Sequence, residues 1–124
     1  MRAEPTTVAR LREADRRDVV VPHPVVAEIS YGIARLPRSK RRSLLEERFA
    51  LVVDILPRMD WTNAVSSAFG DIKASLEKRG LRIEDFDIAI AAHALATEST
   101  LVSGNVKHME NIHGLDLEDW IVER

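Results

Sequence analysis

The sequence predicts a single α/β domain in which short parallel strands alternate with helices. Short β-branched runs alternate along the chain with longer segments of helical periodicity, and strands separated by helices usually pair in parallel. The length of 124 residues suits one domain, and no linker or internal repeat divides residues 1–124. Hydrophobic residues make up 45% of the chain and none is Cys, so the core must form without disulfides.

The first half of the chain contains three predicted helices and two short extended segments. Residues 5–17 have helical periodicity, and residues 18–22 form a β-branched run bounded by Pro, which is typical of a buried strand. Residues 24–36 begin with Pro and carry an apolar stripe, which predicts a second helix. A third helix is expected over residues 39–56, and residues 57–61 form a strand or an extended link. We expect these side chains of the third helix to point inward: Leu44, Leu45, Phe49, Val52, Val53 and Leu56.

The second half of the chain continues the alternation. A fourth helix is expected over residues 62–79, with Thr as its N-cap and Gly80 as its stop signal. Residues 84–97, which are dense in Ala and Ile, predict a fifth helix. Residues 100–103 form a short strand, and the alternating residues 115–120 favour an edge strand.

Composition narrows the classes of function. The 18 basic and 20 acidic residues give a net charge of −2, so a role in nucleic-acid binding must rest on a local patch, metal ions or a partner chain. Apolar stretches are shorter than the ~20 residues of a membrane span, and residues 1–18 lack the apolar core of a signal peptide. We therefore expect a cytoplasmic protein with no membrane contact.

Two carboxylates stand in apolar surroundings. Glu28 lies within the apolar run 25–29, where a charge is expensive to bury without a partner. Asp87 is followed directly by the apolar run 88–92 and therefore opens a helix that must be largely buried. An alternative for Glu28 remains open, namely a boundary residue that pairs with a nearby Arg.

A third polar residue is expected beside Asp87. Asn105 follows a predicted strand, and the carboxyl ends of the strands in an open α/β sheet form one ligand-binding rim. Glu84 and Asp85 precede Asp87 in the same helical turn, where complementation of the helix dipole explains them. Converging oxygen ligands suit Mg²⁺ or Mn²⁺, and an ion held by carboxylates supports phosphodiester hydrolysis. Glu28, Asp87 and Asn105 are therefore the candidate metal ligands, and Glu28 and Asp87 the candidate catalytic residues.

Several familiar catalytic motifs are absent from the sequence. It contains no glycine-rich phosphate loop, no HExxH pair and no nucleophile elbow. The histidines lack the helical spacing of a shared zinc site, so each is interpreted as structural or exposed: His23, His93, His108 and His113.

Five segments of the chain, in order, resemble the PIN-domain toxins of the VapC/FitB type. They are VAEISYGI at 26–33, GLRI at 80–83, DFDIAIAAHAL at 85–95, TLVSGN at 100–105 and GLDLEDW at 114–120. The third segment is the most specific part of the resemblance, which spans essentially the whole chain.

This resemblance implies a PIN-like α/β/α sandwich and a metal-dependent endoribonuclease, the toxin of a type II toxin–antitoxin pair. Glu28 matches the second acid of the family, Asp87 the third, and Asn105 the position of a fourth acid or Asn. The implied cofactor is Mg²⁺ (or Mn²⁺). The implied partners are an RNA substrate, a second copy of the chain in a homodimer, and a cognate VapB-like antitoxin whose DNA-binding half represses the shared operon.

The start of the chain departs from the family pattern. Family members begin with an apolar strand that ends in Leu-Asp-Thr-Asn, whose Asp is the first metal ligand. Residues 1–5 resemble the segment that follows this strand. The first central strand and the first acid are therefore expected to be missing, which a start codon assigned too far downstream would explain.

Three hypotheses follow for function. The first is an RNA-cleaving toxin, in which Glu28 and Asp87 bind metal and orient water. Its basic run would contact RNA phosphates or, alternatively, form a solvated helix face: Arg38, Lys40, Arg41 and Arg42. The second is a catalytically inactive PIN-like module that binds an antitoxin or toxin subunit through residues such as Tyr31 or Trp61. The third is a DNA-directed nuclease on the same fold.

Overall fold

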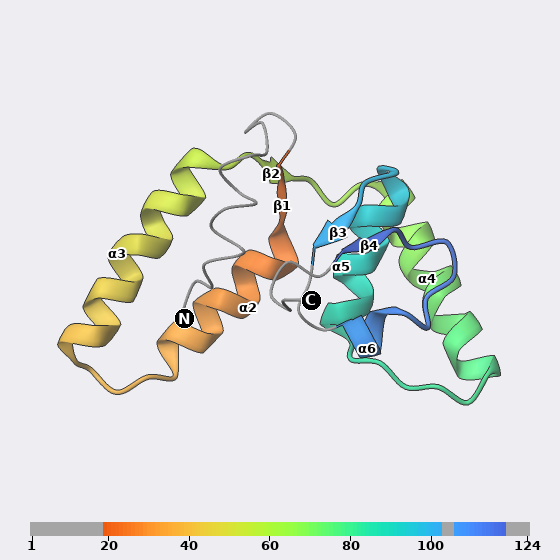
Figure 1. Cartoon of the computed structure of the whole chain (residues 1–124), viewed down its shortest axis with the longest axis horizontal. Helices are drawn as coiled ribbons and strands as arrows, with labels where there is room; N and C mark the ends of the chain where they lie inside the picture. Colours follow the sequence, from red (N-terminus) through yellow and green to blue (C-terminus); the bar gives the residue numbers. More distant parts are fainter. Residues whose placement is uncertain (1–18, 103–105, 119–124) are drawn as a thin grey trace.

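One or two helices separate each two-residue strand from the next along the chain, as the α/β pattern of the sequence predicts (Figure 1). The computed structural model describes residues 19–102 and 106–118. The predicted helix over 5–17 lies outside these described residues, and so does Asn105. The elements are β1 (Val21–Pro22), α2 (His23–Ala34), α3 (Lys40–Ile55), β2 (Arg58–Met59), α4 (Asn63–Lys78), α5 (Asp85–Ala96), β3 (Leu101–Val102), α6 (Val106–Met109) and β4 (Leu117–Glu118).

The strands form two parallel pairs, which confirms the predicted α/β class and the predicted direction of pairing. β1 pairs with β2, with Val21 opposite Arg58. β3 pairs with β4, with Leu101 opposite Leu117. No strand within residues 19–102 and 106–118 joins the two pairs. The strand pairs are therefore minor elements, and helices form most of the described structure.

One half of the molecule consists of α4, α5, α6, β3 and β4 and contains a continuous core (Figure 1). The side chain of Thr62 caps α4 by accepting a hydrogen bond from the Val65 amide (3.3 Å). Gly80 ends the α4 segment with a φ of +69°, a conformation that glycine adopts without strain. Ala91 and Ala92 are fully buried, so α5 presents small side chains that allow close packing against α4. The core cluster consists of Val65, Ile72, Leu76, Ile88, Ala91, Ala92, Met109 and Ile112.

The other half consists of β1, α2, α3 and β2 and buries far fewer side chains. On α3 only Leu45 is buried, while Leu44 and Val52 are 46% and 48% exposed. The prediction that these last two point inward is therefore wrong. The physical reason is that α3 packs mainly against α2, so only one side of α3 has a neighbour among the described elements (Figure 1).

α2 connects the two halves because it contacts both α3 and α5. Its buried or half-buried stripe includes Val25, Ile29 and Ile33, which confirms the apolar periodicity predicted for this helix. None of the helices in the described part of the chain combines the length and apolar character that crossing a membrane requires.

Candidate functional site

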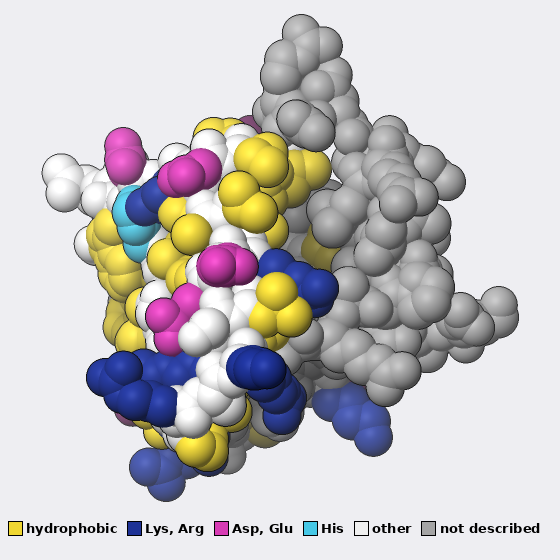
Figure 2. Space-filling model, turned by 90° about the vertical axis from the view of Figure 1, so that its left-hand side faces the viewer, with side chains coloured by type: hydrophobic (Ala, Val, Ile, Leu, Met, Phe, Trp, Pro, Cys, Tyr) yellow, Lys and Arg dark blue, Asp and Glu magenta, His cyan; other side chains and the backbone are white. Residues whose placement is uncertain are grey.

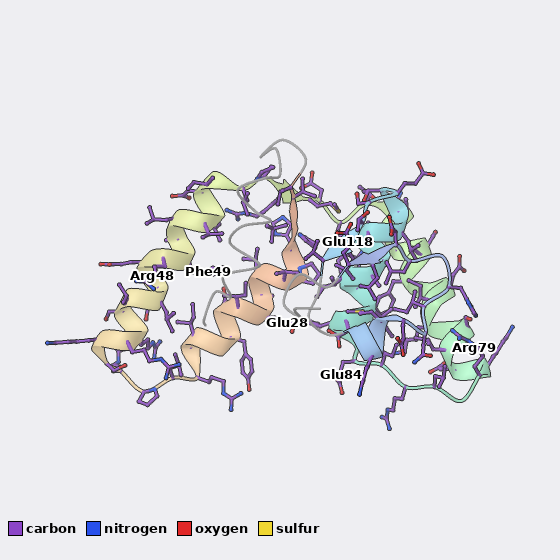
Figure 3. All side chains as sticks on the ribbon, in the orientation of Figure 1. Glu28, Arg48, Phe49, Arg79, Glu84 and Glu118 are labelled. Atoms are coloured by element: carbon purple, nitrogen blue, oxygen red, sulfur yellow. The ribbon has the colours of Figure 1, made fainter. Side chains whose placement is uncertain are left out.

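The two predicted catalytic carboxylates come from different halves of the molecule and lie near one another. Glu28 stands in the middle of α2, and Asp87 lies in the first turn of α5, which α2 contacts. Figure 3 shows Glu28 on α2, on the side toward the start of α5, where Glu84 is labelled. Two segments that are almost sixty residues apart in sequence thus bring their acids to one place.

The electrostatics of Glu28 reflect this arrangement. Although Glu28 is an exposed residue, neighbouring atoms partly shield its carboxyl from water, and this desolvation raises its pKa. The negative charge of Asp87 raises the pKa of Glu28 further, because a like charge disfavours ionisation. The alternative for Glu28 was a boundary residue paired with a nearby Arg. An Arg partner would stabilise the carboxylate and lower its pKa, so it does not account for a raised pKa.

The packing of α5 fixes the position of Asp87. This residue is half-buried, and the seven residues after it, 88–94, are buried. Glu84 occupies the N-cap position but makes no side-chain capping hydrogen bond. Asp85 accepts a hydrogen bond from Lys73 Nζ at 3.0 Å, an ion pair that ties α5 to α4. Asp85 therefore has a structural partner, as well as the favourable place at the helix N-terminus that the sequence predicts.

The donor set fits a hard divalent cation in part. Within the described residues, no group of three or more His, Asp or Glu side chains is arranged to hold a metal ion. Glu28 and Asp87 provide two carboxylates, and Mg²⁺ in proteins is often bound through one or two carboxylates together with water and substrate phosphates. Two carboxylates whose negative charges repel each other are suited to binding a cation between them.

His93 has a structural role. It is 0% exposed, and because its Nδ1 lies 2.8 Å from the Ala89 carbonyl oxygen, Nδ1 must carry the proton and donate it. The Trp61 ring packs edge-on against the imidazole, with the ring centroids 5.2 Å apart. His23 and His113 are exposed. The histidine in the most specific segment of the sequence therefore stabilises α5 from within the core.

The predicted basic run spans the connection from α2 to α3 and the first turn of α3, and its four residues divide into two groups. Arg38, Lys40 and Arg41 are exposed, and Figure 2 shows Lys and Arg side chains gathered at the lower end of this face of the molecule. Arg42 instead holds the turn together. Its Nε binds Glu46 at 2.9 Å, and its Nη1 donates to the Leu36 carbonyl oxygen at 3.1 Å.

Sequence reasoning assigned no RNA-binding role to the surface next to Glu28, and named Tyr31 only as a candidate for binding a protein partner. Tyr31 is 66% exposed, and the Arg35 guanidinium lies 5.9 Å from the centre of its ring. Both follow Glu28 at helical spacings of three and seven residues, which places all three on one face of α2. This spacing was the available signal, because the same periodicity that identifies the buried stripe also identifies the exposed one.

The sequence matches a family model, the PIN domain, over residues 1–112. It is 30% identical over 107 residues to a Rickettsia felis protein named Ribonuclease VapC2, covering 86% of this chain and 78% of the relative. It is 35% identical over 99 residues to a Haemophilus influenzae protein also named Ribonuclease VapC2, covering 77% of this chain and 70% of the relative.

The fold is similar to that of a solved complex. The crystal structure of VapBC2 from Rickettsia felis, bound to a DNA fragment from its promoter, contains a chain that superposes with a TM-score of 0.82. This chain is 27% identical, and the superposition covers 94% of the present chain and 86% of that one. The similarity confirms the PIN-like α/β/α architecture expected from the resemblance.

Proposed function

Because this chain belongs to the PIN-domain family and, within it, to the VapC type, we propose that it is an endoribonuclease toxin of a type II toxin–antitoxin system. In this role it hydrolyses phosphodiester bonds of RNA. The observation that carries the proposal is the proximity of Glu28 on α2 and Asp87 on α5, two helices that contact each other; desolvation of the Glu28 carboxyl and, beside it, the charge of Asp87 both raise the pKa of Glu28. A pair of carboxylates whose charges repel each other is suited to a divalent cation.

Glu28, Asp87 and Asn105 are the residues that would hold Mg²⁺ (or Mn²⁺), with Asn105 included on the strength of the family resemblance alone. A bound divalent cation supplies charge stabilisation at the phosphate and makes water more acidic. Asp87, anchored by the buried part of α5, fixes the position of the site. Glu28 is exposed on α2, so its carboxylate is accessible and suited to orient the attacking water.

The exposed cations beyond the C-terminal end of α2 would neutralise RNA phosphates at a distance from the acids. Arg38, Lys40 and Arg41 take this role, while Arg42 keeps the turn in shape through Glu46 and the Leu36 carbonyl. A local cluster of this kind is what a protein with a net charge of −2 needs in order to bind a polyanion.

The proposed protein partners are a cognate VapB-like antitoxin and a second copy of this chain. The apolar side chains that α3 exposes support a protein partner on that side of the molecule: Leu44, Leu51, Val52 and Ile55. The solved Rickettsia felis complex contains both VapB and VapC components, which supports an antitoxin as one partner. We place the protein in the cytoplasm, where RNA is available.

RNA cleavage in the presence of Mg²⁺ tests the proposed activity. The purified chain, Asp87→Asn and Glu28→Gln are incubated with single-stranded RNA, with folded tRNA and with DNA of the same sequence. We expect cleavage of RNA by the unaltered chain, loss of cleavage in both variants, and an unchanged rate in the control Arg48→Ala, which removes an exposed charge from α3. Equal cleavage by the unaltered chain and Asp87→Asn would contradict the assignment, and cleavage of DNA alone would favour a deoxyribonuclease.

A second candidate function is a PIN-like module that binds an antitoxin or another toxin subunit without cleaving RNA. The observation that favours it is the small number of acids at the site, where the described residues supply Glu28 and Asp87 but no third ligand. Copurification with an antitoxin, combined with no RNA cleavage under any ionic condition, would support this candidate over the nuclease.

A further inference from the structure

We propose that Tyr31 and Arg35 form a binding subsite for an unpaired base of single-stranded RNA, next to the acids on α2. Tyr31 would stack against the base, and Arg35 would support the ring and contact a neighbouring phosphate. This inference rests on the proposed ribonuclease activity and adds to it a subsite on α2 that contacts a base of the bound RNA. Tyr31 and Arg35 are positioning residues and take no part in the chemical step.

Helix geometry places the subsite. Tyr31 follows Glu28 by about 4.5 Å along the axis of α2, and Arg35 follows it by about 10.5 Å, given a rise of about 1.5 Å per residue. Residues three, four and seven positions apart share one face of a helix. The catalytic acid, the aromatic ring and the cation therefore form a continuous exposed stripe, directed from the acids toward the α2–α3 turn.

The Tyr31 ring is available for stacking. Its exposure of 66% is the largest among the exposed large hydrophobic residues of the described chain. The Arg35 guanidinium lies over the ring, 5.9 Å from its centre, an arrangement that restrains the ring and adds positive charge beside it. Aromatic rings and Arg planes are the surfaces on which proteins stack the bases of single-stranded RNA.

The backbone of α2 is also open at this stripe. A Cβ atom added to Gly32, which adjoins Tyr31, would meet no atom of the described residues within 4 Å. Gly in a helix lowers stability by roughly 0.5–1 kcal/mol relative to Ala, and packing within the described residues does not account for it here. The open space at Gly32 leaves room for a ligand to approach the helix backbone next to Tyr31.

The distribution of charge favours RNA over a protein as the occupant. Residues 29–45 contain five Lys or Arg residues and no Asp or Glu, in a chain whose net charge is −2. Arg42 is paired with Glu46, and the remaining cations lie at the C-cap of α2, in the following turn and at the start of α3: Arg35, Arg38, Lys40 and Arg41. In single-stranded RNA, phosphates and bases alternate along the chain. The exposed ring of Tyr31 can stack a base, while the cations that follow it can contact phosphates.

Binding of fluorescein-labelled single-stranded RNA, followed by anisotropy, tests the subsite. The measurement is made in the Asp87→Asn background, so that RNA stays intact, and is repeated with a duplex of the same sequence. We expect Tyr31→Ala to weaken single-strand binding by about 5- to 100-fold and Tyr31→Phe to retain it, because stacking needs the ring and not the hydroxyl. Duplex binding should stay unchanged in Tyr31→Ala, because paired bases are not available to stack.

Two controls separate stacking from general surface effects. Val20→Ala removes a side chain that is 38% exposed and belongs to neither the stripe nor the exposed face of α3, and should leave RNA binding unchanged. Arg48→Ala removes an exposed charge from α3 and should weaken binding less than Arg35→Ala does. In RNA that carries 4-thiouridine, photocrosslinking should map to the peptide that contains Tyr31.

Unchanged RNA binding in Tyr31→Ala, or equal losses with single strand and duplex, would overturn the subsite. The subsite would also be overturned if Tyr31→Ala kept its RNA affinity but no longer bound the antitoxin, because the stripe would then be a protein interface. The proposed nuclease function fails separately, when Asp87→Asn and the unaltered chain cleave RNA equally. Thermal melting should show that Tyr31→Ala folds normally, because the ring is exposed.

Discussion

The two halves of this molecule use similar helices in different ways. In the α4–α5 half, Val65, Leu76, Ile88 and Ala91 are at most 1% exposed, and the helices surround a closed core. In the α2–α3 half, a groove of about 370 Å³ separates the helices, and the labelled Phe49 of α3 lies on the side toward α2 (Figure 3). The α4–α5 half is therefore a stable frame, while the α2–α3 half exposes apolar and basic side chains on its surface.

The difference explains where the candidate site lies. Asp87 belongs to the frame and is fixed by the buried helix α5, while Glu28 belongs to the more open half. The stripe that leads away from Glu28 carries the exposed ring and cations that we assign to RNA. Asp87 is held in place by α5, and the helix near it, α2, has an accessible surface. A large substrate can therefore reach the site, which a fully enclosed core would prevent.

The largest expected effect concerns the stability of the two halves. Ile88→Ala removes side-chain atoms from a residue that is 1% exposed and should lower the free energy of unfolding by about 2–5 kcal/mol. Leu51→Ala on α3, at a residue that is 63% exposed, should change it by about 0.5 kcal/mol or less. Urea denaturation of both variants checks the comparison, and equal losses would mean that α3 is packed as tightly as α5.

A smaller effect is expected at the helix caps. The Ser39 hydroxyl accepts a hydrogen bond from the Arg42 amide (3.1 Å), as Thr62 does at the start of α4. Ser39→Ala and Thr62→Ala should each cost about 0.5–2 kcal/mol of helix stability. We expect amide hydrogen exchange to accelerate along α3 in the first variant but to remain slow in the packed turns of α4 in the second. Acceleration confined to α4 would reverse the proposed ranking of the two halves.

Much of the fold could be predicted because its signals are local. The expected helix over 62–79 is observed as Asn63–Lys78, since Thr62 and Gly80 act on the backbone next to them. Helix α6 was missed because it contains only four residues. The inward orientation of Leu44 and Val52 was mispredicted, because periodicity shows which face is apolar and not whether another element covers it.

The candidate site could be predicted only in part. Glu28 stood out because it interrupts an apolar run, and Asp87 because it opens a buried helix. Their proximity depends on how α2 packs against α5, which no local pattern specifies. Tyr31 was predicted only to bind a protein partner, and Arg35 was not singled out, because exposed side chains carry little signal until a neighbouring functional group is known.

The pKa of the Glu28 carboxyl, measured by NMR titration, tests most directly whether the two halves share one site. In the unaltered chain this pKa should lie above the ordinary value, because desolvation and the charge of Asp87 both disfavour ionisation. The folded state then binds more protons than the unfolded state between the ordinary and the raised pKa. Stability should therefore decline as the pH rises through that window.

In Asp87→Asn, the pKa of Glu28 should fall toward its ordinary value while staying above it, since desolvation is the larger cause and persists. In Asp85→Asn, the matched control whose acid pairs with Lys73, it should stay where it is in the unaltered chain. Addition of Mg²⁺ to the unaltered chain should lower it. A Glu28 pKa that is the same in the unaltered chain and in Asp87→Asn would contradict a shared site.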